Sequence, residues 1–164
     1  MRTPMPQGRR HRAAAGALGA LTLAAASLGV APPAAAMTFG NYLLHIPDRR
    51  DFHTYVWNIQ APCYTPEFAK RTDCVIVVSV PQPIAKAIDA RVEAELRDGR
   101  YTMVIDDPFG LRCGDIYFGP TIPTHDVYSW DPQTLTGELV SSFAAGCDGA
   151  PGGRITYPFF LTRM

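Results

Sequence analysis

The chain has 164 residues, with 15 basic and 15 acidic side chains and therefore no formal net charge. This length is sufficient for one domain with a substantial hydrophobic core. It excludes a miniprotein that depends on disulfides or metal ions alone for its stability. After residue 36 the Lys and Arg residues form no cluster of the kind that neutralises phosphates, so we expect no nucleic acid among the partners.

The first 36 residues have the three parts of a secretory signal peptide. They comprise a basic start, an uncharged run rich in Ala and Gly, and the small-residue cleavage site Ala34-Ala35-Ala36. A retained membrane anchor is the alternative, but Ala and Gly drive insertion only weakly. We therefore predict a signal peptide over residues 1–36 and a domain over 37–164 that is secreted or held in the cell envelope. General secretion fits better than the twin-arginine route, because the neighbours of Arg9-Arg10 depart from that consensus.

The domain after residue 36 is mildly acidic. The signal segment carries four of the 15 basic side chains and none of the acidic ones, so 11 basic and 15 acidic side chains remain among 128 residues. No later segment has the ~18 apolar residues of a transmembrane helix, and we predict no membrane span after signal cleavage.

Period-two alternation of apolar and polar residues predicts antiparallel strands along the whole domain. The β-branched run Val75–Val80 predicts a strand buried on both faces, and Pro158 predicts that the last strand lies at a sheet edge or a bulge. The alternating sets are Tyr42, Leu44 and Ile46; Tyr55, Trp57 and Ile59; Leu139, Ser141 and Phe143; and Ile155, Tyr157, Phe159 and Leu161.

Residues 83–97 allow two interpretations. Apolar residues recur every four positions from Ile84 to Leu96, which favours a helix. Asp98-Gly99, in contrast, is the two-residue signal for a type I′ turn, and apolar residues alternate on both sides of it. We therefore predict a β-hairpin over residues 90–106, with any helix confined to roughly 83–90.

All four cysteines lie after the predicted cleavage site, in a compartment that favours disulfides. They are Cys63, Cys74, Cys113 and Cys147, which allow three pairings. The short interval between the first two favours a Cys63–Cys74 clip, which leaves Cys113 to pair with Cys147. The sequence has no C-x2-C pair, so we predict disulfides rather than metal ligation.

His125 and Asp126 are weak catalytic candidates. Adjacent residues of a strand point to opposite faces, and the sequence has no G-x-S-x-G motif to supply a nucleophile. His45, Asp48 and His53 lie close together, but their spacing matches no familiar metal-ligand pattern. We therefore predict no catalytic residue, no metal and no cofactor, with a secreted hydrolase that uses His125 as the alternative.

Aromatic residues on several predicted strands have two possible roles. Trp57, Trp130, Tyr55 and Tyr128 fill the interior of a rolled sheet if they face inward. If they line a pocket or an exposed platform instead, they bind a small apolar ligand. Core packing is favoured, and the four residues stay weak candidates for ligand binding.

Four motifs give the second half of the chain a distinctive pattern: D-G-R-Y-T-M from Asp98, D-P-F-G-L-R-C-G from Asp107, P-T-H-D-V-Y-S-W-D from Pro123 and G-C-D-G-A-P-G-G from Gly146. As a set they resemble a group of small exported mycobacterial proteins, over roughly residues 38–164. The resemblance implies export, disulfide bonds and an extended segment before Asp98. It assigns no catalytic residue.

We expect one all-β domain of about eight antiparallel strands in meander order, forming a rolled sheet or partial barrel with two disulfides. A β-sandwich is the alternative architecture, and an α+β fold follows if residues 83–97 are helical. For function we expect an exported non-catalytic protein that binds a protein partner or a small apolar ligand at or outside the cell envelope. The hydrolase and a structural component of the envelope are the alternatives.

Overall fold

The structure is a computed structural model that describes residues 37–49, 55–81, 88–116 and 118–164. By internal contacts the chain divides into two compact units, Met1–Ala31 and Pro32–Met164, and all the described residues belong to the second unit. The signal-peptide prediction for residues 1–36 lies outside the described residues, as does most of the possible helix at 83–90.

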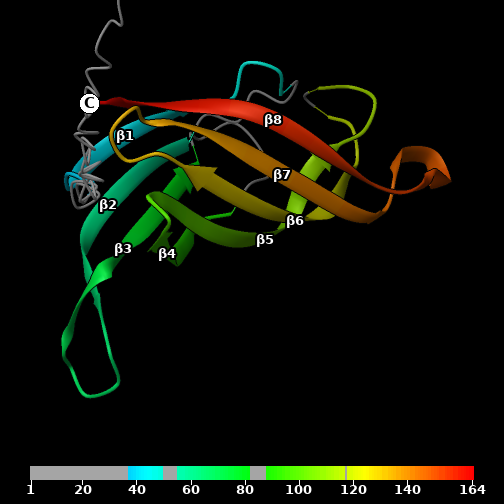
Figure 1. Cartoon of the computed structure of the whole chain (residues 1–164). Coiled ribbons are helices and arrows are strands. Elements are labelled where there is room, and N and C mark those ends of the chain that lie inside the picture. The colour runs from blue at the N-terminus through cyan, green and yellow to red at the C-terminus, as the bar shows by residue number, and fades with distance from the viewer. Residues whose placement is uncertain (1–36, 50–54, 82–87, 117) are drawn as a thin grey trace, which may run out of the picture. The chain divides into compact units, whose positions relative to one another are not determined.

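Among the described residues, eight antiparallel strands form one sheet in meander order, each paired with the next (Figure 1). Because β1 also pairs with β8, the sheet closes on itself. The prediction of about eight antiparallel strands in a single meander domain is therefore confirmed. The strands are β1 (Gly40–His45), β2 (Tyr55–Tyr64), β3 (Lys70–Pro81), β4 (Ala90–Arg97), β5 (Arg100–Arg112), β6 (Thr121–Trp130), β7 (Thr136–Ala145) and β8 (Pro151–Arg163).

β4 and β5 form the predicted hairpin, and they pair at three positions beside their turn. Asp98 and Gly99 have positive φ angles of 50° and 80°, as a type I′ turn requires. The helical interpretation of residues 90–97 is wrong because an apolar spacing of four also fits the two-residue period of a strand. The described residues contain one short 3-10 helix, η1 (Cys147–Gly149), and no α-helix, so the α+β alternative does not hold for them.

Inward-facing aromatic residues fill one half of the interior. Trp57 and Trp130 are fully buried, and their ring centroids lie 5.2 Å apart. Tyr101 stacks on Trp130 at 5.5 Å, and Tyr128 packs against Trp57 in a T-shaped pair at 5.3 Å. Aromatic pairs at such separations add about 0.5–1.5 kcal/mol each beyond the area that they bury. This half of the interior is therefore an aromatic core.

Two strand predictions need correction. β8 is paired on both sides rather than at a sheet edge, and the missing N–H of Pro158 is tolerated because β1 pairs only with the residues that follow Phe159. β3 is not buried on both faces. Its residues alternate, with Val77 buried and Val78 partly exposed, because the outer face of the closed sheet meets solvent.

Two disulfides brace the sheet, in the predicted pairing. Cys63–Cys74 joins β2 to β3, and Cys113–Cys147 joins the residue after β5 to the turn before β8. The Cα atoms are 5.5 Å apart in both bridges. In the loop-closure model such bridges stabilise a domain by about 3–4 kcal/mol each.

Within the described residues, the structure contains no helix with the length and hydropathy needed to cross a membrane.

Candidate functional site

The interior of the sheet changes from apolar to polar toward the end where β5 finishes and β6 begins. Four polar residues with buried side chains face inward there, from three neighbouring strands. The same alternation that directs the aromatic residues inward at the other end also directs these residues inward, because successive side chains of a strand point to opposite faces. The four are Asp107, Thr124, Asp126 and Ser141.

Asp126 is the centre of this polar group. Its side chain is only 1% exposed, and it lies opposite Ser141 in the β6–β7 ladder. The Ser141 hydroxyl donates a hydrogen bond to Oδ1 of Asp126 over 2.5 Å, and Nη1 of Arg49 lies 4.0 Å from Oδ2. Burial raises the pKa of Asp126, although the Ser141 hydrogen bond and the positive charge of Arg49 oppose that shift.

Arg49 reaches the polar end from the turn that follows β1. The backbone N–H of Arg49 donates to the Ile46 carbonyl over 3.2 Å. Its side chain is only 6% exposed, and Nη2 donates to the carbonyl of Gly110. The guanidinium is therefore positioned between a carboxylate on β6 and a backbone carbonyl on β5, as a buried cation requires.

Gly110 makes this arrangement possible. It lies in an irregular part of β5, where the register with β6 shifts between Asp107 and Leu111. A Cβ atom on Gly110 would fall 1.7 Å from Oγ1 of Thr124, so only glycine permits this approach. The Asp107 carboxylate accepts a hydrogen bond from the backbone N–H of Phe109 over 2.8 Å. The segment is thus a bulge that aims the Gly110 carbonyl at Arg49.

A cavity of about 300 Å³ opens beside Arg49 and Gly110. Its wall is mixed, with guanidinium and carboxylate groups next to aliphatic and aromatic side chains. The interior of an eight-stranded closed sheet is either filled by side chains or holds one small ligand, and this volume is at the lower end of the range of small-molecule sites. The lining residues are Asp48, Arg49, Gly110, Leu111, Arg112, Gly114, Ile116, Ile155 and Tyr157.

His125 and Asp126 point to opposite faces, as predicted. His125 lies on the outer face, where its Nδ1 is 2.7 Å from Oδ1 of Asp106 and its side chain is more than half exposed. Ser142 occupies the paired position on β7, but its hydroxyl donates to the backbone carbonyl of His125 over 3.2 Å. These residues line an open groove together with Pro108, Pro123 and Phe143.

The four aromatic candidates are all buried. Trp57, Trp130, Tyr55 and Tyr128 belong to the core cluster, so they form no platform that is open to solvent. The cavity at the polar end is lined by other residues.

Within the described residues, neither His45 nor Asp48 belongs to a group of side chains placed to hold a metal ion. The ring of His45 stacks on Phe160 with the centroids 4.5 Å apart, Asp48 lines the cavity, and His53 lies outside the described residues. Elsewhere, ligand atoms of Cys63, Cys74 and Glu93 lie within 4.8 Å of one another. Both cysteines are in a disulfide, and a metal binds the thiolate form, so this group is not a metal site as it stands.

Sequence reasoning named Asp126 only as a weak catalytic candidate and missed the other residues that build the polar end. A polar Ser141 within an apolar alternating set was a usable signal, because buried polar groups need partners. Arg49 gave no such signal. Its role depends on Asp126 and Gly110, which are distant along the chain and approach it only when the sheet closes.

Comparison with known proteins gives no significant match: no family model fits the chain, and neither a curated protein nor a solved structure is similar to it.

Proposed function

We propose that the protein is an exported, non-catalytic binding protein whose ligand occupies the cavity at the polar end of the sheet. The observation that carries this proposal is the cavity itself, whose wall includes Arg49, the buried ion-pair partner of Asp126. A buried ion pair contributes little to stability compared with well-packed apolar residues. Its presence beside a cavity is better explained by recognition than by folding.

The cavity wall favours a small ligand with an apolar body and a polar group. Leu111, Ile116 and Ile155 offer apolar surface, whereas Arg49 and Arg112 bring two guanidinium groups to the same wall. Apolar walls with a few placed polar groups are typical of small-molecule sites. Because two arginines face a single carboxylate, that of Asp48, on this wall, we expect the polar group of the ligand to accept hydrogen bonds or carry negative charge.

Export is supported by the two disulfides. Such bonds persist in oxidising compartments and are rare in the cytosol. Together with the signal-peptide pattern of residues 1–36, they favour a protein that acts at or outside the cell envelope.

Native mass spectrometry of protein purified after export tests the proposal. We expect wild-type protein to carry a small molecule that denaturation releases. Replacing Ile155 with Trp fills the cavity and should abolish the bound mass. The matched control is Thr156→Trp, one residue along the same strand but on the exposed outer face, and it should retain the ligand. A wild-type protein without bound mass, or equal loading of both variants, would contradict the proposal, provided that circular dichroism shows both variants folded.

A hydrolase at His125 is the second candidate function, because its Nδ1 lies 2.7 Å from the Asp106 carboxylate. A carboxylate in that position fixes the tautomer of a general base. If this candidate is right, the purified protein hydrolyses p-nitrophenyl acetate and His125→Gln abolishes the activity. Asp126→Asn serves as the control, because that carboxylate faces the opposite side of the strand. Equal rates for wild type and His125→Gln would exclude this function.

A further inference from the structure

The β2–β3 hairpin extends past its neighbours in the sheet (Figure 1). β1 pairs with β2 only as far as Ile59, and β4 pairs with β3 only from Cys74 onward. The remainder of the hairpin, which ends in the turn between β2 and β3, therefore projects as a two-stranded arm. We call residues 64–70 the hairpin tip.

The hairpin tip presents aromatic side chains to solvent. Phe68 is 86% exposed and Tyr64 is 55% exposed. Phe68 also has a φ of 63°, in a region that residues with a Cβ atom seldom adopt. An exposed apolar side chain held in an unfavourable backbone conformation is typical of an interaction site rather than of a folding requirement.

Backbone polar groups at the tip find partners within the turn. The N–H of Thr65 donates to the Ala69 carbonyl, and the N–H of Phe68 donates to the Thr65 carbonyl, both over 2.9 Å. The Thr65 hydroxyl accepts from the N–H groups of Glu67 and Ala69, both over 3.3 Å. Internal satisfaction of backbone groups is what an apolar phase demands of a segment that enters it.

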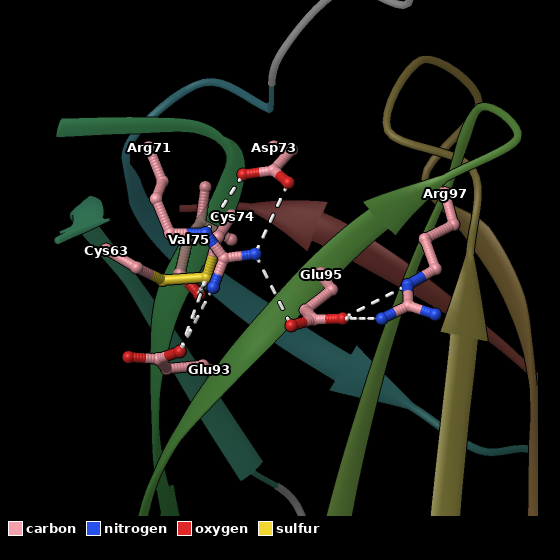
Figure 2. Close-up of polar contacts among 8 residues, drawn as sticks. All are labelled: Cys63, Arg71, Asp73, Cys74, Val75, Glu93, Glu95 and Arg97. Atoms are coloured by element: carbon pink, nitrogen blue, oxygen red, sulfur yellow. Dashed lines mark hydrogen bonds and ion pairs between the residues drawn. A yellow bond between two sulfur atoms is a disulfide. The ribbon is translucent and has the colours of Figure 1, made fainter. Parts of the chain in front are cut away.

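The base of the arm is held rigid. The Cys63–Cys74 disulfide joins its two strands. Beside it, Arg71 forms ion pairs with Asp73 at 3.1 Å, with Glu93 at 3.7 Å and with Glu95 at 3.3 Å (Figure 2). These contacts tie the arm to β4, so little conformational freedom is lost when the tip binds.

The strand edges of the arm are poorly suited to pairing with a partner strand. The β2–β3 register shifts between Ile59 and Pro62 and again before Tyr64, and charged residues of β3 such as Arg71 and Asp73 lie along the arm. Irregular register and charge are features that block edge-to-edge pairing. Recognition through side chains at the tip is therefore favoured.

We propose that the hairpin tip docks on a lipid surface, with Phe68 entering the boundary between head groups and acyl chains. Tyr64 and Lys70 flank Phe68, and such side chains place apolar atoms in that boundary while their polar ends stay hydrated. Glu67 and Lys70 have opposite charges, so the contact does not depend on anionic lipid. A protein pocket would also accept a phenylalanine side chain. The backbone N–H groups of the tip described above are already paired within the turn, however, so they offer a protein partner no hydrogen-bond donor.

Vesicle binding tests this proposal on protein purified after export. We expect the wild type to co-sediment with phosphatidylcholine vesicles, with or without phosphatidylglycerol. Phe68→Ser should weaken binding about tenfold, which corresponds to about 1.4 kcal/mol, the scale of burying one aromatic side chain. The matched control is Phe118→Ser, since Phe118 is 92% exposed but belongs to the β5–β6 loop. This control should bind like the wild type.

Fluorescence locates the contact. The two native tryptophans are fully buried, so the emission of an added Trp at the tip stands out against a constant background. Phe68→Trp should shift to shorter wavelength on vesicles, and Phe118→Trp should not. Absence of wild-type binding, equal binding by Phe68→Ser, or no shift at position 68 would overturn the proposal, and the last result is the one expected of a tip that binds a protein instead.

Discussion

The two ends of the closed sheet contain very different interiors, although the same strands build both. At one end, Trp57, Trp130 and Tyr101 are fully buried and pack on one another. At the other end the inward positions hold Asp126 and Ser141. Alternation decides which residues point inward, but residue type decides what the interior does there. Aromatic packing stabilises the fold at one end. At the other end, next to the cavity, buried polar and charged groups take the place of apolar packing and contribute less to stability.

Truncation at the aromatic end should have the largest effect. Trp130→Ala removes a fully buried side chain and should lower the free energy of unfolding by about 3–5 kcal/mol. Urea denaturation followed by circular dichroism measures this change. Phe160→Ala, at a position that is 41% exposed, is the control. A loss as large for Phe160→Ala as for Trp130→Ala would show that the aromatic end is not the main source of stability.

At the polar end, replacing one residue of the Arg49–Asp126 pair should cost more stability than replacing both residues. Asp126→Ala leaves the Arg49 guanidinium without its carboxylate and should cost about 3 kcal/mol. The double change Arg49→Met with Asp126→Leu should cost far less, because no unpaired charge remains buried. A thermodynamic cycle over the two single variants and the double variant measures the difference. Additive costs would contradict a coupled pair.

Backbone strain gives an intermediate effect at the Asp98–Gly99 turn. Gly99 has a φ of 80°, and a Cβ atom there would meet nothing within 4 Å, so the cost of a side chain is conformational alone. Gly99→Val should destabilise by about 2 kcal/mol. The variant should keep the far-ultraviolet spectrum of the wild type. Denaturation of Gly99→Val at the wild-type midpoint would argue against positive φ in this turn.

Acid titration should give the smallest effect, with opposite signs for two carboxyl groups. Hydrogen bonds from Arg97 and Arg71 lower the pKa of Glu95. The stability that Glu95 contributes is therefore present above its unfolded pKa of about 4.3, and it is lost as the pH falls through the lower folded value. Burial raises the pKa of Asp126. Its contribution is therefore present below its unfolded pKa of about 3.9 and is lost as the pH rises through the folded value.

Two variants separate these contributions. Compared with the wild type, Glu95→Gln should lose less stability when the pH is lowered from neutral toward 3, and Asp126→Asn should lose more. Urea denaturation at a series of pH values measures both slopes. Departures from the wild-type slope in the same direction for the two variants would contradict the assignment.

The sequence allowed most of the fold to be predicted, because the informative signals were local. The turn at Asp98-Gly99 outweighed the four-residue spacing that imitated a helix, and the short interval between Cys63 and Cys74 indicated their pairing. The polar end was not predictable in the same way. Arg49 contacts Asp126 and the Gly110 carbonyl only because the sheet closes. These residues are distant along the chain, so no local sequence pattern predicts the contact. Pro158 likewise suggested an edge because the limited extent of β1 beside it was not visible in the sequence.

Hydrogen–deuterium exchange on the purified protein, before and after the proposed ligand is stripped, tests the central proposal most directly. The claim is that the polar end is the binding site. It predicts that stripping the ligand accelerates amide exchange around residues 111–116 and 155–157, with no change around residues 130–137 at the aromatic end. Faster exchange confined to the aromatic end, or no change anywhere, would contradict it.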